Sequence, residues 1–139
     1  MNTKQKIFSY LGQGLVLLSL LSLVYVSGMA WWNPRAIMAL VHEKLTNTDS
    51  ISSIRGVYGG VGLFVVSVLG YLWSTGLTIT MRFLSIFWFL YAASRLLTWV
   101  VDGPLGSFGM QWLVIELFLG ISCLMLSYLV KTEPVPVPV

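Results

Sequence analysis

Four long apolar runs constrain this chain more than any other feature of its sequence, because each is long enough to cross a lipid bilayer. A transmembrane helix needs about 20 consecutive, mainly apolar residues. The runs that meet this requirement are residues 7–30, 54–73, 77–101 and 108–130. They predict an all-α fold, an integral membrane four-helix bundle.

The composition supports a lipid environment for the whole chain. Hydrophobic residues make up 57% of the sequence and charged residues 9%, which leaves too little polar surface to cover a water-soluble globule. We therefore expect one membrane domain over residues 1–131, followed by a Pro/Val tail at 132–139. Proline at every second position disfavours a helix there, so the tail is either a disordered end or an extended peptide that docks on a partner.

The first run has one alternative interpretation, a cleaved signal peptide. Lys4 and Lys6 precede it, and the small residues Gly28 and Ala30 near its end resemble a cleavage site. However, its apolar stretch is longer than the core of a signal peptide, which spans about 7–15 residues. We expect a membrane span.

The segment between the first two runs has the pattern of a short interfacial helix over residues 34–46. Asn33 can cap it, with Pro34 at its first position. One face of that helix is apolar, and Trp31 and Trp32 before it would anchor it at the headgroup level. The apolar face comprises Ile37, Leu40, Val41 and Leu45. Candidates to cap the next helix are Asp49, Ser50, Ser52 and Ser53.

Lysine and arginine positions predict the orientation in the membrane. The positive-inside rule places the side with more of these residues in the cytoplasm. Lys4, Lys6, Arg82 and Lys131 fall on the side of the N-terminus, and Arg35, Lys44 and Arg55 fall on the other. We expect a multi-pass protein whose N- and C-termini are both cytoplasmic.

Glycines gather at the start of the second run, in SIRGVYGGVG. Small residues spaced four apart let two helix backbones approach closely in a membrane. The residues that would form this surface are Gly56, Gly59, Gly60 and Gly62. Packing within the chain is the ordinary use of such a surface, and a dimerisation face is the alternative.

Arg95 lies well inside the third run, where a charged side chain costs about 2.5–3.5 kcal/mol on insertion scales. It lies about 10 Å below Asp102 along the helix axis, and Glu116 lies about 12 Å into the fourth run from the same side of the membrane. Arg95 and Glu116 therefore reach a similar depth. Because each would otherwise be an isolated buried charge, we expect them to pair.

The same leaflet collects further polar residues, so the pair belongs to a predicted intramembrane polar cluster. Its members are Arg55, Tyr58, Tyr91, Arg95, Asp102 and Glu116. One interpretation is structural, since a buried ion pair can fix helix register. The other is a pocket for a lipid headgroup, a small lipophilic molecule or a partner's side chain, because intramembrane charges are candidates for function.

The order of these motifs resembles a known family. RGVYGG at residues 55–60, SRLLTWVVDGP at residues 94–104 and a lone Glu116 in the last run are similar to those of an uncharacterised bacterial family of short four-span membrane proteins, a domain of unknown function. The resemblance implies four helices in a bacterial inner membrane. It marks Arg55, Gly59, Gly60, Arg95, Asp102 and Glu116, and it implies no activity.

Catalytic and metal chemistry have little support in the sequence. His42 and Cys123 fall on different segments and are too few for a metal site. No nucleophile and base occur at motif spacing, and no phosphate-binding loop or basic patch with interleaved aromatics is present. We expect no enzyme activity, no cofactor and no nucleic-acid partner.

Two classes of function remain. The first is a non-enzymatic accessory or scaffolding subunit of a membrane complex, with membrane lipids and either another membrane protein or further copies of itself as partners. The alternative is binding or transport of a small lipophilic molecule or a lipid headgroup in a charged pocket in the non-cytoplasmic leaflet.

Overall fold

The computed structural model describes residues 2–130 and shows an all-α bundle of four long helical segments. These segments are α1 (Thr3–Trp32), the continuous run of α3 (Thr48–Ile54), η1 (Arg55–Gly60) and α4 (Val61–Thr75), then α5 (Leu77–Asp102) and α6 (Ser107–Leu129). Each is long and apolar enough to cross a membrane. The predicted fold class is therefore confirmed. The Pro/Val tail and Lys131 lie outside the described residues.

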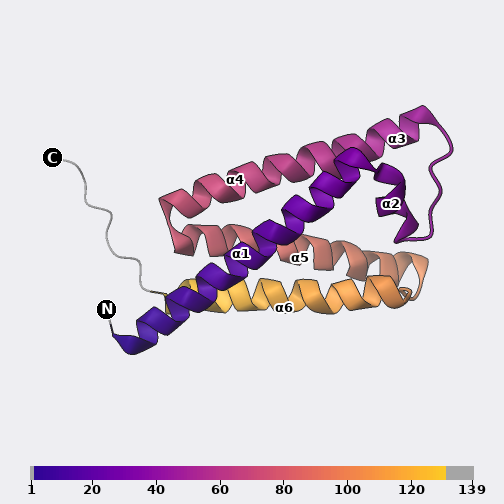
Figure 1. Cartoon of the computed structure of the whole chain (residues 1–139). Helices are drawn as coiled ribbons and strands as arrows, with labels where there is room; N and C mark the ends of the chain where they lie inside the picture. The colour runs from indigo at the N-terminus through magenta and orange to yellow at the C-terminus, as the bar shows by residue number, and fades with distance from the viewer. Residues whose placement is uncertain (1, 131–139) are drawn as a thin grey trace.

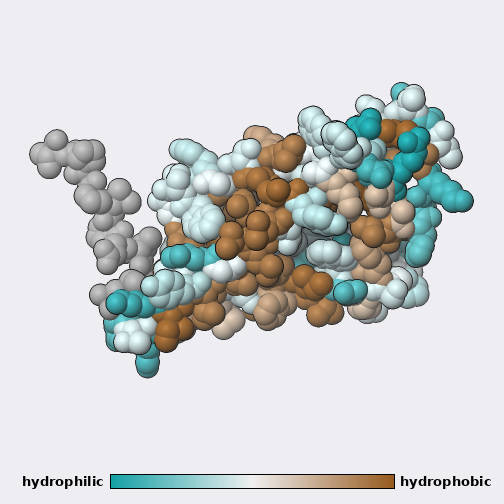
Figure 2. Space-filling model, viewed as in Figure 1, coloured by the Kyte–Doolittle hydropathy of each residue, from teal (hydrophilic) through white to brown (hydrophobic). Residues whose placement is uncertain are grey.

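α5 packs against both α4 and α6, and α1 packs across all three. α5 and α6 form the most extensive helix pair, and α1 crosses the bundle diagonally, contacting α4, α5 and α6 (Figure 1). Hydrophobic side chains gather across the middle of the molecule. Hydrophilic ones are concentrated at the start of α1 and over α3 and the segment before it (Figure 2). This distribution suits a protein whose middle lies in hydrocarbon and whose ends reach water.

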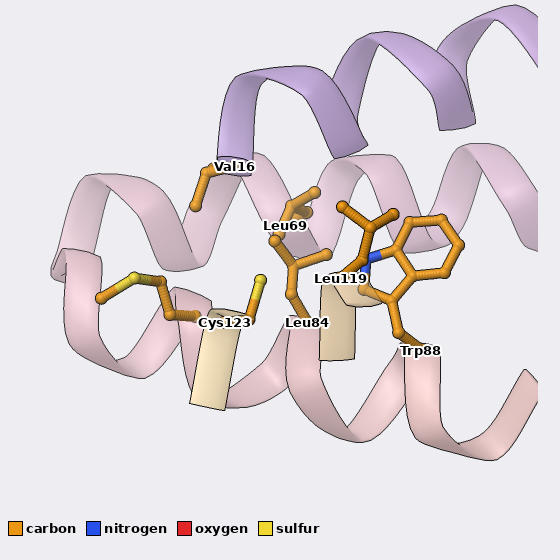
Figure 3. Close-up of a cluster of buried hydrophobic side chains, with 7 residues drawn as sticks. Val16, Leu69, Leu84, Trp88, Leu119 and Cys123 are labelled. Carbon is orange, nitrogen blue, oxygen red and sulfur yellow. The ribbon is translucent and has the colours of Figure 1, made fainter. Parts of the chain in front are cut away.

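The best-packed part of the core draws on all four spans. It consists of Val16, Leu69, Met81, Leu84, Trp88, Leu119 and Cys123, each at most 6% exposed (Figure 3). The Trp88 indole N–H donates a hydrogen bond to Ser19 Oγ of α1 at 3.3 Å. Trp88 thus joins α5 to α1 at the edge of this core.

The glycine-rich stretch forms a turn of π-helix, η1, and α1 packs directly on it. A Cβ on Gly59 would lie 3.2 Å from the backbone N and Cα of Trp31, and one on Gly62 would overlap Ser27 Oγ. Gly60 lies near the Trp31 ring, whereas Gly56 has open space beside it. Gly59 and Gly62 therefore serve close packing within the chain.

The segment after α1 forms a shorter helix than its pattern predicts. Asn33 caps it as expected, accepting a hydrogen bond from Ala36 N–H, with Pro34 at the first position. α2 covers only Pro34–Ala39, not residues 34–46. The chain leaves the helix because His42 adopts φ 61° and Glu43 N–H turns back to the Met38 carbonyl. The remaining residues up to Asn47 lie outside any helix.

The start of the second helical segment also differs from expectation. Asn47 caps α3, because its side-chain oxygen accepts a hydrogen bond from Ser50 N–H at 2.8 Å. Asp49, Ser50, Ser52 and Ser53 were the predicted caps, and all of them lie inside the helix. Asn47 was overlooked because several capping residues occur in succession, and the first of them begins the helix.

Candidate functional site

The expected ion pair between α5 and α6 is present. Arg95 Nε donates to Glu116 Oε1 at 2.9 Å and to Oε2 at 2.8 Å. The Glu116 side chain is 1% exposed and that of Arg95 is 24% exposed. Both hydrogen bonds start from Nε, and neither Nη group of Arg95 donates to another residue within 2–130. The buried carboxylate of Glu116 therefore has hydrogen bonds to both oxygens, while the Nη groups of Arg95 are still available as donors.

Arg95 and Glu116 both line a partly open cavity of about 220 Å³ between α1, α2, η1, α5 and α6. Four members of the predicted polar cluster line it, and they come from three different elements. They are Tyr58 from η1, Tyr91 and Arg95 from α5, and Glu116 from α6. The helix packing thus assembles residues that are far apart in sequence into one concave site.

Four of the other lining residues are aromatic. Phe87 and Trp88 come from α5, and Phe108 and Trp112 from α6. The Phe87 ring packs on Tyr91 with centroids 5.0 Å apart and edge-on against Trp88 at 5.1 Å. Because Trp88 also belongs to the packed core, it forms the boundary between that core and the cavity.

The other two sides of the cavity come from α1 and from the segment that begins with α2. α1 contributes Ser22, Leu23 and Val26, and the second segment contributes Ile37, Met38, Leu40 and Val41. Three of the four residues predicted for the apolar face of the interfacial helix, Ile37, Leu40 and Val41, thus line the cavity, and Leu45 does not. α2 covers the cavity instead of lying apart from it.

Arg55 lies outside this cavity, so its grouping with Arg95 and Glu116 is wrong. Its Nε donates a hydrogen bond to the backbone carbonyl of Trp31 at 3.1 Å. Trp31 is in the last turn of α1, where carbonyl groups lack partners within the helix and a positive charge is favoured. Arg55 lies apart from the polar cluster because its side chain donates a hydrogen bond to a carbonyl group at the C-terminal end of α1.

Asp102 is the other predicted cluster member that lies elsewhere. It is the last residue of α5, it is exposed, and it forms no ion pair with Arg95. Asp102 is therefore not brought together with Arg95 and Glu116, contrary to the predicted cluster. A charge at the end of a span can reach the interface, so nothing draws it toward the buried pair.

The aromatic wall was overlooked in the sequence, although its spacing is visible there. Phe87, Tyr91 and Arg95 are four residues apart in α5, and Phe108, Trp112 and Glu116 repeat this spacing in α6. Residues four apart share a helix face. Each charged residue therefore ends an aromatic stripe. Because α5 and α6 are antiparallel, the two stripes extend in opposite directions from the Arg95–Glu116 pair. No group of three metal-binding side chains occurs within the described part of the chain.

Comparison with known proteins gives one match. A family model described as a domain of unknown function (DUF4345) matches residues 11–127. The matched region includes all or most of every helix of the bundle and all residues that line the cavity. No curated protein matches the chain. No solved structure matches it either.

Proposed function

The chain belongs to the DUF4345 family, whose function is unknown, and we propose that it binds a small, uncharged lipophilic molecule in the cavity between α1, α2, η1, α5 and α6. One observation carries this proposal. An ion pair whose guanidinium retains unused donors opens into a cavity that is otherwise lined mainly by aromatic and aliphatic side chains of the membrane domain. A pair that only fixed helix register would have no need of such a space beside it. The role is binding, without catalysis.

The charge balance of the cavity favours an uncharged ligand. Arg95 and Glu116 neutralise each other, and the other polar side-chain groups of the lining residues are uncharged: the hydroxyls of Ser22, Tyr58 and Tyr91 and the indole N–H groups of Trp88 and Trp112. A charged ligand would lose its hydration without gaining an unpaired opposite charge. An oxygen acceptor on a neutral ligand, in contrast, can receive hydrogen bonds from the Arg95 Nη groups.

The volume and walls favour a planar ring. An apolar cavity of about 150 Å³ is large enough to take benzene, so the cavity of about 220 Å³ has room for a substituted or fused ring. Aromatic side chains pack on such a ring in offset or edge-on arrangements. Phe87 and Trp88 supply such surfaces from α5 on one side of the Arg95–Glu116 pair, and Phe108 and Trp112 supply them from α6 on the other side.

A pair of serine variants tests the proposal without disturbing the ion pair. Ser22 lines the cavity, whereas Ser67 is exposed on α4, and each donates its hydroxyl to the carbonyl four residues earlier. Ser22→Leu should fill the cavity, and Ser67→Leu should not. Binding of naphthol, a neutral fused ring with one hydroxyl, is measured by equilibrium dialysis against protein in lipid nanodiscs, with empty nanodiscs as the blank.

We expect saturable naphthol binding to the wild type and to Ser67→Leu, and binding weakened about ten-fold or more in Ser22→Leu, a change equivalent to about 1.4 kcal/mol. Naphthalene, which has no oxygen, and naphthoate, which is charged, should both bind more weakly than naphthol. Equal binding of naphthol to the two serine variants would remove the cavity as the site.

A role as an accessory or scaffolding subunit is a second candidate, supported by the outer surface of the bundle. Gly14 and Gly28 of α1 and Gly70 of α4 have no other part of the described chain within 4 Å of an added Cβ. Small residues on a lipid-facing surface admit a neighbouring helix, from another protein or a second copy. Native mass spectrometry after gentle extraction separates the two functions, since a stoichiometric protein partner supports the subunit role.

For the location, we propose a bacterial inner membrane with both termini cytoplasmic. Lys4, Lys6 and Arg82 support this orientation through the positive-inside rule. The cavity and the α2 segment would then occupy the non-cytoplasmic leaflet, and membrane lipids would be the immediate partners of the bundle.

A further inference from the structure

A second concave surface lies where α1 ends and the second helical segment passes it. It is an open groove of about 680 Å³ lined by Trp31, Trp32, Ser52, Arg55 and Gly56. None of these residues lines the cavity that holds Arg95 and Glu116. The groove is therefore a separate site, and it carries the arginine that the polar cluster leaves out.

Arg55 gives the groove an unpaired positive charge in a fixed position. Its Nε is held by the Trp31 carbonyl, which orients the guanidinium plane. No carboxylate within residues 2–130 forms an ion pair with it, and the groove lining contains no acidic side chain. The Nη groups of a guanidinium match the oxygens of a phosphate group as a two-pronged donor.

The other lining residues leave room for such a group and place it near lipid. Apart from its chain neighbours and the backbone of its own helix, Gly56 has no atom within 4 Å of an added Cβ, so the groove is open at this residue. Ser52, one turn before Arg55, offers a hydroxyl on the same helix face. Trp31 and Trp32 are 54% and 87% exposed, as expected of tryptophans that sit among lipid headgroups.

We propose that this groove binds the phosphate of a membrane phospholipid. Arg55 donates to the phosphate oxygens through its Nη groups and Ser52 donates through its hydroxyl, while the two indoles pack against the glycerol and the first part of the acyl chains. The occupant is a lipid because the aromatic walls of the groove lie at the membrane interface, where phospholipid is the abundant phosphate. The site does not depend on the function proposed for the inner cavity.

The test measures lipid binding to delipidated full-length protein in detergent by native mass spectrometry. The probes are dioleoylphosphatidylglycerol, dioleoylglycerol, which has the same acyl chains without phosphate, and inorganic phosphate. Gly56→Leu fills the groove and leaves the Arg55–Trp31 hydrogen bond in place. Gly70→Leu is its control, because Gly70 also faces open space but lies far along α4. Arg55→Gln removes the charge, and Arg35→Gln removes an exposed charge outside the groove.

We expect the wild type, Gly70→Leu and Arg35→Gln to bind the phospholipid in preference to the other two probes. Loss of charge-assisted hydrogen bonds should weaken this binding about ten-fold or more in Gly56→Leu and Arg55→Gln. Wild-type affinity in Gly56→Leu would overturn the proposal. Equal binding of dioleoylglycerol would assign the groove to acyl chains, and competition by inorganic phosphate at equal concentration would assign it to any anion. Either result would also overturn it.

Measuring naphthol binding to the same variants shows whether a change in the groove also affects the inner cavity. Gly56→Leu should retain it, because Gly56 does not line that cavity. Loss of phospholipid binding with naphthol binding intact is the result that supports a separate lipid site. Loss of both in Gly56→Leu would mean that the groove is not an independent site, and would count against the proposal.

Discussion

At the scale of single residues, the two members of the Arg95–Glu116 pair differ in how many of their hydrogen-bonding groups are used. Glu116 is buried, and both of its carboxylate oxygens accept a hydrogen bond from one donor atom of Arg95. Arg95 therefore meets the hydrogen-bonding needs of this carboxylate. Arg95 meets those needs with Nε alone. Both hydrogen bonds to the Glu116 carboxylate come from Nε, and the Nη groups of Arg95 remain available to a ligand in the cavity. One contact can therefore stabilise the bundle and also bind a ligand.

Removing one member of this pair should be costly. Arg95→Ala leaves an uncompensated buried charge, and we expect the free energy of unfolding in detergent to fall by about 3–5 kcal/mol. Arg95→Ala with Glu116→Ala should recover part of the loss, giving a coupling energy of about 1–3 kcal/mol in a double-mutant cycle. Arg82→Ala is the control on the same helix, since it loses only an exposed contact with the Tyr128 ring. Additive losses would show that the pair contributes no stability of its own.

The pairing itself was predictable from the sequence, whereas two of the charges were misplaced. A fixed rise per residue determines depth, so Arg95 and Glu116 could be matched before any packing was known. Arg55 could not be placed this way, because its partner is a backbone carbonyl at the end of another helix. Which carbonyl lies beside it depends on how α1 crosses the second segment, and side-chain chemistry does not encode that crossing.

At the scale of elements, η1 sets how closely α1 and the second segment approach. A π-helical turn is wider than an α-helical one and is frequently found at functional sites. Here it brings Gly59 against the Trp31 backbone, while Tyr58 lines the cavity. The glycines predicted a close approach in the sequence. The change to π geometry had no separate signal, because the same residues are compatible with an α-helix.

A side chain at Gly59 should therefore disrupt the bundle. Gly59→Val would press on the Trp31 backbone, which cannot rotate away as a side chain could, and we expect a loss of about 1–3 kcal/mol in the free energy of unfolding. Gly70→Val carries the same change in helix propensity at an open position and should be close to neutral. The midpoint of chemical unfolding in detergent compares the two. Equal midpoints would show that the contact with α1 is not stabilising.

The α2 segment shows what pattern recognition misses at this scale. Its apolar face was predicted from periodicity, and three residues of that face, Ile37, Leu40 and Val41, all line the cavity. The helical pattern continues to Leu45, but the helix ends at Ala39. Periodicity identifies residues that face the same side, and a turn can satisfy that requirement as well as a helix does. Its position over the cavity depends on tertiary packing against α1.

At the scale of the whole molecule, the two ends of the bundle differ in kind. The end at which α5 begins has a dense core, whereas the end at which α5 finishes has the cavity, the groove and the α2 segment. Four spans were predictable from the length and apolarity of the runs. This division was not, because it depends on which side chains meet between helices.

The orientation of these two ends in the membrane can be measured with reporters. A reporter fused after Val139 should give a cytoplasmic signal, and one inserted in the connection between α5 and α6, at residues 103–106, should give the opposite signal. The expected bias follows from the lysines and arginines at the ends of the spans. The reverse pair of signals would place the cavity in the cytoplasmic leaflet.

Because Cys123 is buried, the rate at which its thiol is alkylated can measure how often the bundle opens inside a membrane. Cys123 is the single cysteine of the sequence, and it is 0% exposed within the packed core. A membrane-permeant maleimide can alkylate this thiol only when α6 separates from its neighbours and water reaches the sulfur, because the thiolate is the reactive form. The rate of alkylation in intact vesicles therefore reports how often the bundle opens, without an added label. The same reaction compares any variant that leaves Cys123 in place with the wild type, in the native lipid.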